Sequence, residues 1–315
     1  MLKAYDYIDA TADRKTIQKS ENFNQELKLA KKAVSRVLQI EQGAAPVCPG
    51  CASKNLSVFF AKWGVDYLRC ADCGTIFCEV DDETLEAYHS DADLNDFRSR
   101  DAYQQEASEK RRFSWQEIID WIQFRAYRYL KKNKGLSMVS GGDRYTGFAE
   151  MMKESDICGS YSVLGESDSR AEVALSFNLI QQSNSPEEHL TALNRQLQDG
   201  GLLFLSARIG SGFDILVLRE HAQVYPYEYV TLLSRDGLAN LLEKAGFELL
   251  DYSTPGAMDV GYVQSKRAAI PQDDLFIRNL IFDSDSTTLR EFQRFLQKSG
   301  MSSYAQIVAR KREER

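Results

Sequence analysis

Four cysteines form the most specific chemical pattern in the chain. Cys48 and Cys51 are separated by two residues, and Cys70 and Cys73 repeat this spacing after an interval of 18 residues. Two residues between thiols allow one tight turn to direct both sulfurs at a single ion, and two such turns complete a tetrahedral site. The pattern predicts a structural Zn²⁺ site, because four thiolates leave no open coordination position for catalysis.

The segment between the two cysteine pairs must bring them together. Residues 56–63 and 65–69 are rich in β-branched and aromatic residues, which favour strands, and Gly64 between them suits a tight turn. The sequence therefore predicts a β-hairpin, and with it a zinc ribbon that extends over residues 46–80.

The composition excludes several classes of protein. The 315 residues are 43% hydrophobic and 27% charged, which provides a sizeable core and rules out global disorder. A net charge of −7 makes the chain a poor general binder of nucleic acid, so we expect no such partner. The first residues lack a secretory signal and no apolar run approaches the roughly 18 residues of a membrane span, so we expect a cytoplasmic protein.

Helical patterns lie on both sides of the ribbon. An amphipathic pattern predicts a helix over residues 22–41. A second helix is predicted to begin at Ser114, because Ser114 and Glu117 match a capping box, and to end at Gly135.

Strand and helix patterns alternate from residue 136 onward, which implies a mainly parallel sheet covered by helices on both faces. A further helix at 287–298 and a possible last strand at 304–309 follow. The alternating strands are predicted at 136–140, 161–164, 172–177, 202–207 and 247–252, with helices at 148–155, 186–198 and 234–244.

Several short segments carry a family resemblance. Behind the ribbon follow Tyr88-His89-Ser90, Leu197-Gln-Asp-Gly-Gly-Leu-Leu203, Ala245-Gly246-Phe247 and Ser253-Thr-Pro-Gly-Ala-Met-Asp-Val260, in that order. With the ribbon and the α/β pattern, they resemble the class I S-adenosylmethionine-dependent methyltransferases, above all the zinc-containing sugar C-methyltransferases. The resemblance covers residues 46–262. It implies a doubly wound, Rossmann-like sheet of the seven-strand type, with a small N-terminal zinc-ribbon domain and helical extensions.

This resemblance divides the chain into five segments. We expect an N-terminal helical segment at 1–45, the zinc ribbon at 46–95 and a helical linker at 96–135. A methyltransferase-like α/β domain is then expected at 136–265, and a C-terminal helix with the possible last strand at 266–315.

The resemblance also implies a site for S-adenosylmethionine at the turn after the first strand. This turn, residues 140–147, reads Ser-Gly-Gly-Asp-Arg-Tyr-Thr-Gly, and Gly142 and Gly147 are its candidate cofactor-binding residues. Ser140 stands where the family has an acidic residue, and Arg144 or Tyr145 replaces the middle glycine. These departures predict weak cofactor binding.

A carboxylate further along the chain completes the implied cofactor site. Glu166 follows Gly147 by 19 residues and ends a predicted strand, where the family places an acidic residue. A carboxylate there accepts hydrogen bonds from both ribose hydroxyls.

The catalytic positions implied by the resemblance depart further from the family. Gln182 and Tyr229 stand where two Glu-His pairs of the sugar enzymes have histidine, although Glu228 is present. A histidine is a suitable base at neutral pH, whereas glutamine has no basic group. His221, before the tyrosine-rich loop, is the best remaining base candidate, and it is equally well explained as a solvated loop residue. We therefore take His221, Glu228 and Tyr229 as the catalytic candidates.

Two functions compete on these residues. The first is S-adenosylmethionine-dependent methylation of a carbohydrate, as a nucleotide-linked or glycan sugar, in polysaccharide biosynthesis; transfer to oxygen suits the lost histidines better than transfer to carbon. The alternative is a catalytically degenerate methyltransferase fold that serves as a binding or scaffold subunit. A zinc-ribbon nucleic-acid modifier is a weaker third reading, because the net charge opposes it.

Overall fold

A six-stranded sheet forms the centre of the computed structural model, which describes residues 21–38, 46–142 and 146–313. Neighbouring strands β5, β4, β6 and β7 are parallel, while β10 runs antiparallel between β7 and β9. The predicted α/β class is confirmed, with six strands in place of seven in the described part of the chain. In sheet order the strands are β5 (Cys158–Val163), β4 (Leu136–Ser140), β6 (Ala171–Phe177), β7 (Leu197–Arg208), β10 (Tyr304–Lys311) and β9 (Phe247–Ser253).

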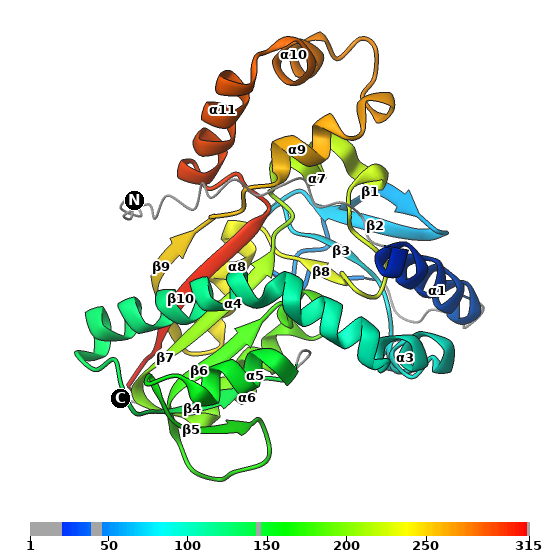
Figure 1. Cartoon of the computed structure of the whole chain (residues 1–315). Coiled ribbons are helices and arrows are strands. Elements are labelled where there is room, and N and C mark those ends of the chain that lie inside the picture. Colours follow the sequence, from blue (N-terminus) through cyan, green and yellow to red (C-terminus); the bar gives the residue numbers. More distant parts are fainter. Residues whose placement is uncertain (1–20, 39–45, 143–145, 314–315) are drawn as a thin grey trace.

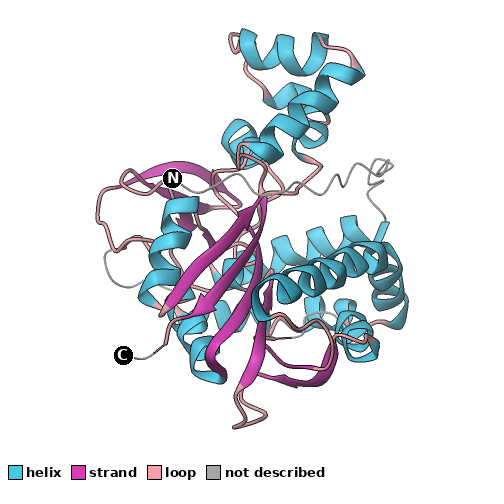
Figure 2. Ribbon diagram, turned by 90° about the vertical axis from the view of Figure 1, so that its left-hand side faces the viewer, coloured by secondary structure: helices cyan, strands magenta, loops and turns pink. Residues whose placement is uncertain are grey.

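Helices cover both faces of this sheet, as its apolar strands require (Figure 2). One face packs against α6 (Pro186–Gln196) and α8 (Arg235–Lys244) through leucines such as Leu190 and Leu241. The other face packs against α4 (Asp101–Leu130) and α5 (Thr146–Glu154). The central strands are therefore buried on both sides, and their exposed ends are left to form a site.

The last strand lies inside the sheet. β10 pairs with β7 over seven registered positions, from Tyr304 opposite Arg208 to Arg310 opposite Leu202. On its other side it pairs with β9. A domain boundary after residue 265 would therefore divide one continuous sheet, because β10 of the C-terminal segment lies within it.

The predicted ribbon hairpin is confirmed. Strands β1 (Leu56–Lys62) and β2 (Val65–Cys70) are antiparallel, and Trp63 and Gly64 form their turn with φ of +54° and +88°. Strand β3 (Ile76–Cys78) extends the hairpin and pairs with β8 (Thr231–Leu232), which belongs to the α/β part of the chain. The ribbon is thus joined to the main body by backbone hydrogen bonds.

Helices around the ribbon differ partly from the sequence prediction. Helix α1 covers Glu21–Val37, and the predicted extension toward residue 41 reaches residues outside the described part. Two short helices, α2 (Asp82–His89) and α3 (Ala92–Arg98), connect the ribbon to α4.

The predicted start of α4 is wrong. The helix begins at Asp101, so Ser114 lies near its middle, and it ends at Leu130, before Lys131 in a left-handed conformation with φ of +58°. No glycine or proline interrupts residues 101–130, and a capping-box pattern alone does not end a helix that continues on its N-terminal side.

The remaining helices form an arm that projects from the sheet (Figure 1). The predicted helix at 287–298 is confirmed as α11, and its cap Asp285 accepts hydrogen bonds from the amides of Thr287 and Thr288. None of the described helices combines the length and the hydropathy that crossing a bilayer requires. The arm and its approach contain α7 (Phe213–Leu218), α9 (Asp259–Gln264), a 3-10 turn (Arg267–Ala269), α10 (Leu275–Arg278), a π-helix (Asn279–Asp283) and α11 (Ser286–Lys298). Two further 3-10 turns lie outside the arm, at Ile180–Gln182 after β6 and at Arg219–His221 after α7.

Candidate functional site

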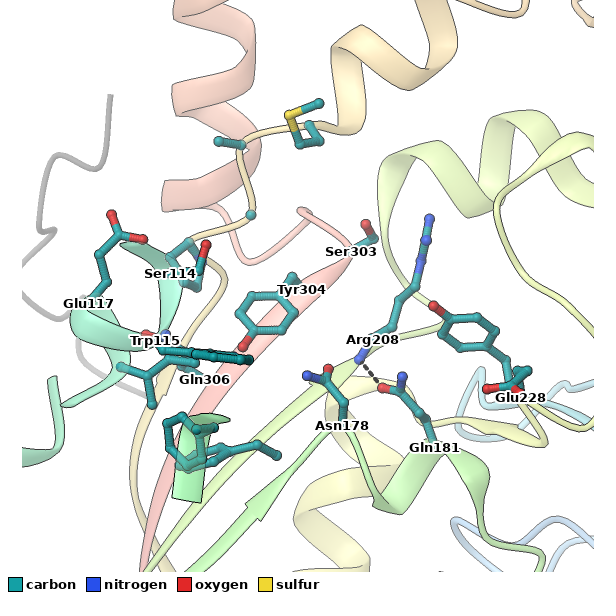
Figure 3. Close-up of a pocket in the computed structure, with 18 of the residues that line it drawn as sticks. Ser114, Trp115, Glu117, Asn178, Gln181, Arg208, Glu228, Ser303, Tyr304 and Gln306 are labelled. Atoms are coloured by element: carbon teal, nitrogen blue, oxygen red, sulfur yellow. Dashed lines mark hydrogen bonds between the residues drawn. The ribbon is translucent and has the colours of Figure 1, made fainter. Parts of the chain in front are cut away.

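A cavity of about 690 Å³ opens at the carboxyl ends of the parallel strands. Its wall includes the residues at or just beyond the ends of β4, β6 and β7, which are Ser140, Asn178 and Arg208. Ligands of open α/β sheets bind at this edge, because the loops that follow the strands converge there. Figure 3 shows Trp115 and Tyr304 on one side of the cavity and Arg208 and Glu228 on the other.

We call the first side the glycine end, and Ser140, Gly142, Trp115 and Asn178 line it. The Ser140 hydroxyl donates to the Gly142 carbonyl at 3.0 Å and accepts from the Gly142 amide at 3.3 Å. Both hydrogen bonds of this hydroxyl are therefore made within its own turn. The family resemblance implied an acidic residue at this position. Gly142 has φ of +155°, a conformation that side chains with a Cβ rarely adopt.

The other predicted cofactor residues do not gather at this turn. Gly147 lies in α5 and is not among the residues that line the cavity. Glu166 is exposed and also absent from the cavity wall, and its carboxylate accepts a hydrogen bond from the Val163 amide at 2.9 Å. Arg144 and Tyr145, one of which replaces the middle glycine of the family, lie outside the described residues.

Helix α4 supplies the acidic groups that are found near the glycine end. Glu117 and Asp120 line the cavity, together with Ser114 and Trp115 from the same face of the helix (Figure 3). The Ser114–Glu117 pattern was interpreted as a helix cap, so sequence reasoning missed these groups as part of a site. Their i, i+3 spacing was the available signal, since it places both side chains on one face.

The His189 ring packs against Gly141 of the glycine turn. A Cβ on Gly141 would lie 2.8 Å from the His189 ring, so this close packing requires glycine. The ring nitrogen Nε2 is 2.9 Å from the Ser176 hydroxyl, and burial lowers the pKa of His189. His189 is therefore a buried imidazole that packs against the glycine turn.

The second side of the cavity is the tyrosine end, lined by Tyr225, Glu228, Tyr229, Arg98 and Arg208. Glu228 is buried, with 7% of its surface exposed, and accepts a hydrogen bond from the Tyr88 hydroxyl at 3.0 Å. It also pairs with Arg98, whose Nε is 3.0 Å from a Glu26 oxygen. The predicted residues Glu228 and Tyr229 therefore face the same cavity as Gly142.

His221 is not part of this assembly. It lies in a 3-10 turn, about half of its side chain is exposed, and its Nε2 is 3.6 Å from Glu220. It is absent from the residues that line the cavity, so the structure does not bring it to Glu228 and Tyr229.

Arg208 is the charged residue that sequence reasoning missed. It ends β7, forms an ion pair with the fully buried Asp214, and donates from Nη1 to the Gln223 carbonyl at 3.0 Å. Burial opposes its charge, but the surrounding groups, with Asp214 first among them, together outweigh burial and raise the pKa of Arg208 above its usual range. Arg208 is therefore a permanent cation at the tyrosine end.

Glutamine 181, and not its neighbour, occupies the loop position that faces the cavity. The Gln181 side-chain oxygen accepts from the Arg208 amide at 2.6 Å, as Figure 3 shows, and the residue is 4% exposed. Gln182 instead donates to the Asn178 carbonyl at 3.1 Å. The family resemblance placed Gln182 at the catalytic position of this loop, whereas the structure places the preceding residue, Gln181, at the cavity.

Aromatic rings complete the tyrosine end. Tyr225 stacks on Trp63 of the ribbon hairpin with ring centroids 5.4 Å apart, and burial raises the pKa of Tyr225. The Arg208 guanidinium lies 5.9 Å from the ring centroids of both Tyr229 and Tyr262. These rings form an apolar surface around charged groups.

The Thr-Pro-Gly segment of the family resemblance forms another part of the wall. Pro255 and Gly256 line the cavity, and the Gly256 carbonyl accepts hydrogen bonds from Gln293, Gln297 and Ser302. A Cβ on Gly256 would lie 2.3 Å from the Ser302 hydroxyl, so no larger residue fits. The segment thus fixes the cavity wall to the C-terminal arm.

The four predicted zinc ligands lie together. Their sulfur atoms are all within 4.8 Å of one another, with 3.5 Å between Cys48 and Cys73 and 3.6 Å between Cys51 and Cys70. Zinc–sulfur bonds of about 2.3 Å in a tetrahedron place sulfurs about 3.8 Å apart. The cluster therefore has the ligand number and spacing of a four-thiolate metal site.

The sequence of residues 20–252, more than half of the chain, matches a family described as a methyltransferase domain. The chain belongs to this methyltransferase family. A search of curated proteins gave no match for this methyltransferase-family chain.

Solved structures similar to this methyltransferase-family chain have low sequence identity. The plantazolicin methyltransferase BamL, in complex with a triazolic desmethylPZN analog and SAH, is 11% identical; the match covers 73% of this chain and 94% of that one, with a TM-score of 0.40. The 1,6-didemethyltoxoflavin-N1-methyltransferase of Burkholderia thailandensis is 12% identical, covering 77% and 98%, with a TM-score of 0.39. A putative sarcosine dimethylglycine methyltransferase from Galdieria sulphuraria is 12% identical, covering 62% and 86%, with a TM-score of 0.38.

Proposed function

We propose that this methyltransferase-family chain transfers a methyl group from S-adenosylmethionine to a hydroxyl group of a carbohydrate, in the cytoplasm. One observation carries the proposal. A single cavity joins the glycine end, at the first strand of the parallel sheet, to the tyrosine end, where ionisable groups are gathered. A cofactor and an acceptor bound at the two ends would meet inside one cavity.

The glycine end has the groups that this cofactor needs. Trp115, Phe148 and Phe177 provide aromatic surface for an adenine ring, and Gly142 leaves the backbone open to a ligand. Glu117 and Asp120 supply carboxylates near a ligand that has ammonium and sulfonium charges, in place of the predicted Glu166. When bound, the cofactor would supply an electrophilic methyl group.

The tyrosine end would hold the acceptor. Glu228 would accept the proton of the acceptor hydroxyl, and Tyr229 would pack against the sugar ring. No histidine is among the described residues of the cavity wall, which favours transfer to oxygen over carbon, since removal of a carbon-bound proton needs a stronger base.

We also propose that the four-cysteine cluster holds Zn²⁺. The metal would thereby support the loop at residues 225–230, which we call the acceptor loop because it lines the tyrosine end. The Tyr67 hydroxyl of β2 donates to the Tyr229 carbonyl at 2.8 Å, and the Cys78 amide of β3 donates to the Val230 carbonyl at 2.9 Å. A ribbon fixed by a metal would hold this loop against the cavity.

Calorimetric titration with S-adenosylmethionine, on the wild type and two glycine variants, tests the proposal. Gly142→Ala should weaken cofactor binding by about tenfold or more, because the added Cβ strains the turn that lines the cavity. Gly165→Ala is the matched control, since Gly165 also has a positive φ, of +90°, but is exposed and outside the cavity wall.

Two results distinguish the proposal from a scaffold role. Binding that Gly142→Ala weakens and Gly165→Ala leaves unchanged supports an enzyme. No binding at millimolar cofactor favours a degenerate fold, which the closed Ser140 turn already suggests as the competing function.

A further inference from the structure

We infer that Gln181 and Asn178 bind the acceptor sugar directly, through hydrogen bonds between their carboxamide groups and two neighbouring hydroxyls of the ring. This inference rests on the proposed function, and it names the residues that recognise its acceptor. Unused hydrogen-bonding groups on the turn after β6 carry the inference, together with the contacts that hold this turn against the sheet.

The Gln181 carboxamide is fixed at its oxygen and unused at its nitrogen. Oε1 accepts from the Arg208 backbone amide at 2.6 Å, and this bond decides the orientation of the group, since the reverse orientation would oppose two N–H donors. Nε2 has no hydrogen-bond partner among the residues that the structure describes. Because Gln181 is 4% exposed and lines the cavity, a ligand or water inside the cavity must accept from these N–H groups.

Asn178 presents a second carboxamide to the same cavity. Its backbone has φ of +57°, a left-handed conformation that asparagine tolerates better than most residues and that glycine adopts freely. The Asn178 amide donates to the Ser206 carbonyl at 2.8 Å, and the Asn178 carbonyl accepts from Gln182 at 3.1 Å. No described residue forms a hydrogen bond with its side chain, which lines the cavity. The backbone is thus fixed, and the carboxamide is available to a ligand.

Strand β7 sets the spacing of the two residues. Asn178 bonds to Ser206 and Gln181 bonds to Arg208, and alternate residues of a strand lie about 7 Å apart. A pyranose ring with its hydroxyls has a similar length, so one sugar can reach both residues.

The pair also lies where the two ends of the cavity meet. Asn178 lines the glycine end, whereas the Gln181 carbonyl accepts from the Val230 amide of the acceptor loop at 2.7 Å. Figure 3 shows Asn178 and Gln181 between Tyr304 on one side of the cavity and Glu228 on the other. An acceptor held here would have its reacting hydroxyl near the place where the methyl group must arrive.

The chemistry of the two carboxamides matches a pair of hydroxyls. A hydroxyl both donates and accepts, the Asn178 side chain offers one group of each kind, and Nε2 of Gln181 offers donors only. One sugar oxygen therefore accepts from Gln181, while its neighbour exchanges a hydrogen bond with Asn178. Since the Arg208 amide already holds the Gln181 side chain, little rotational freedom is lost when the sugar binds.

The test measures sugar binding to the full chain by NMR of nitrogen-labelled protein. The probes are the methyl α-glycosides of D-glucose, D-mannose and D-galactose, which differ only in the arrangement of their hydroxyls. We expect at least one of them to bind and to shift the Nε2 signals of Gln181, which are identified by their loss in Gln181→Glu.

Gln181→Glu also tests the binding role. The carboxylate keeps the shape of the side chain and still accepts from the Arg208 amide, but it replaces the two N–H donors by an acceptor. We expect sugar binding to weaken by about tenfold or more. Gln181→Met is the second variant if the buried charge prevents folding. Gln198→Glu is the control, because it makes the same substitution at an exposed residue of β7 outside the cavity wall.

Asn178→Gly separates a binding role from a structural one. Glycine suits a φ of +57°, so the turn is kept while the carboxamide is removed. We expect sugar binding to weaken several-fold with no fall in the melting temperature. Unchanged binding would show that asparagine serves only the backbone of the turn.

The remaining outcomes separate this inference from the proposed function. Binding by none of the three glycosides, or binding that Gln181→Glu leaves unchanged, overturns the inference. Weaker binding of S-adenosylhomocysteine in the variants, with sugar binding unchanged, would assign the two carboxamides to the cofactor and also overturn it. Failure of S-adenosylhomocysteine to bind the wild type counts against the proposed function alone, because the sugar titrations need no cofactor.

Discussion

The two ends of the cavity differ in how their polar groups are engaged. At the glycine end, the Ser140 hydroxyl is used inside its own turn, and the acidic groups come from a helix beside the sheet. At the tyrosine end, Arg98 of α3 pairs with Glu26 of α1 and with Glu228, and Arg208 of β7 pairs with Asp214 of α7. The tyrosine end is therefore the more pre-organised part of the cavity, whereas the glycine end has fewer fixed polar groups.

The largest expected effect concerns the support of the tyrosine end. Cys70→Ser should remove the proposed zinc and destabilise the ribbon and its attached loop, because a structural zinc site contributes on the order of 10 kcal/mol in small zinc domains. Metal analysis should show that the zinc content falls below one ion per chain. The melting temperature should also fall by a large amount.

Cys158→Ser is the control for this change, since Cys158 is a half-buried thiol in β5 and outside the cluster. Full zinc occupancy in a Cys48/Cys70 double variant would contradict the assignment, and would break the proposed link between ribbon and acceptor loop.

A smaller effect is expected from the buried pair at the tyrosine end. Arg208→Met leaves the fully buried Asp214 without its partner and should cost about 3–5 kcal/mol of unfolding free energy in urea. Adding Asp214→Asn should recover a large part of this loss, because the unpaired charge is removed. Additive losses in the double variant would show that the pair is not coupled.

At the glycine end, an added charge should strengthen binding. Ser140→Asp restores the acidic residue of the family while it still accepts from the Gly142 amide, and a charge-assisted hydrogen bond contributes about 1.5–3 kcal/mol. Calorimetry should report S-adenosylmethionine binding about tenfold tighter than the wild type. Ser140→Asn, which has the same shape without the charge, should give no such gain; equal gains in both variants would exclude the electrostatic explanation.

The smallest expected effect is a pH dependence of folding stability that comes from His189, which packs against the glycine turn. Burial lowers the pKa of His189 in the folded chain, so the unfolded chain binds more protons below its pKa of about 6.5. Stability from this residue is therefore present above that pH and falls as the pH drops through 6.5, by less than about 1.4 kcal/mol per pH unit. Urea unfolding at several pH values should show this slope in the wild type and a flatter one in His189→Gln; an unchanged slope would assign it to other groups.

The features that the sequence predicted well are those fixed by local spacing. The paired cysteines, the turn at Gly64 and the alternation of strands and helices each depend on neighbours within a few residues, and the structure has them in the predicted places. The expected methyltransferase family is confirmed by the family match over residues 20–252.

Long-range contacts account for what the sequence left unresolved. Nothing in residues 304–309 indicates that β10 enters between β7 and β9, because strand pairing with distant segments carries no local pattern. Arg208 follows the strand predicted at 202–207, and its ion pair with Asp214 forms only where α7 packs near the end of β7. Glu166 has the spacing along the chain that the family resemblance requires, but its carboxylate bonds to the Val163 amide and does not line the cavity.

A crystal structure with S-adenosylhomocysteine tests the central claim most directly. We expect the ligand to occupy the glycine end, with its homocysteine or ribose against Gly142 and its adenine against Trp115, and to leave the tyrosine end open for an acceptor. A ligand bound elsewhere, or an empty cavity at saturating ligand, would contradict the assignment of this cavity to methyl transfer.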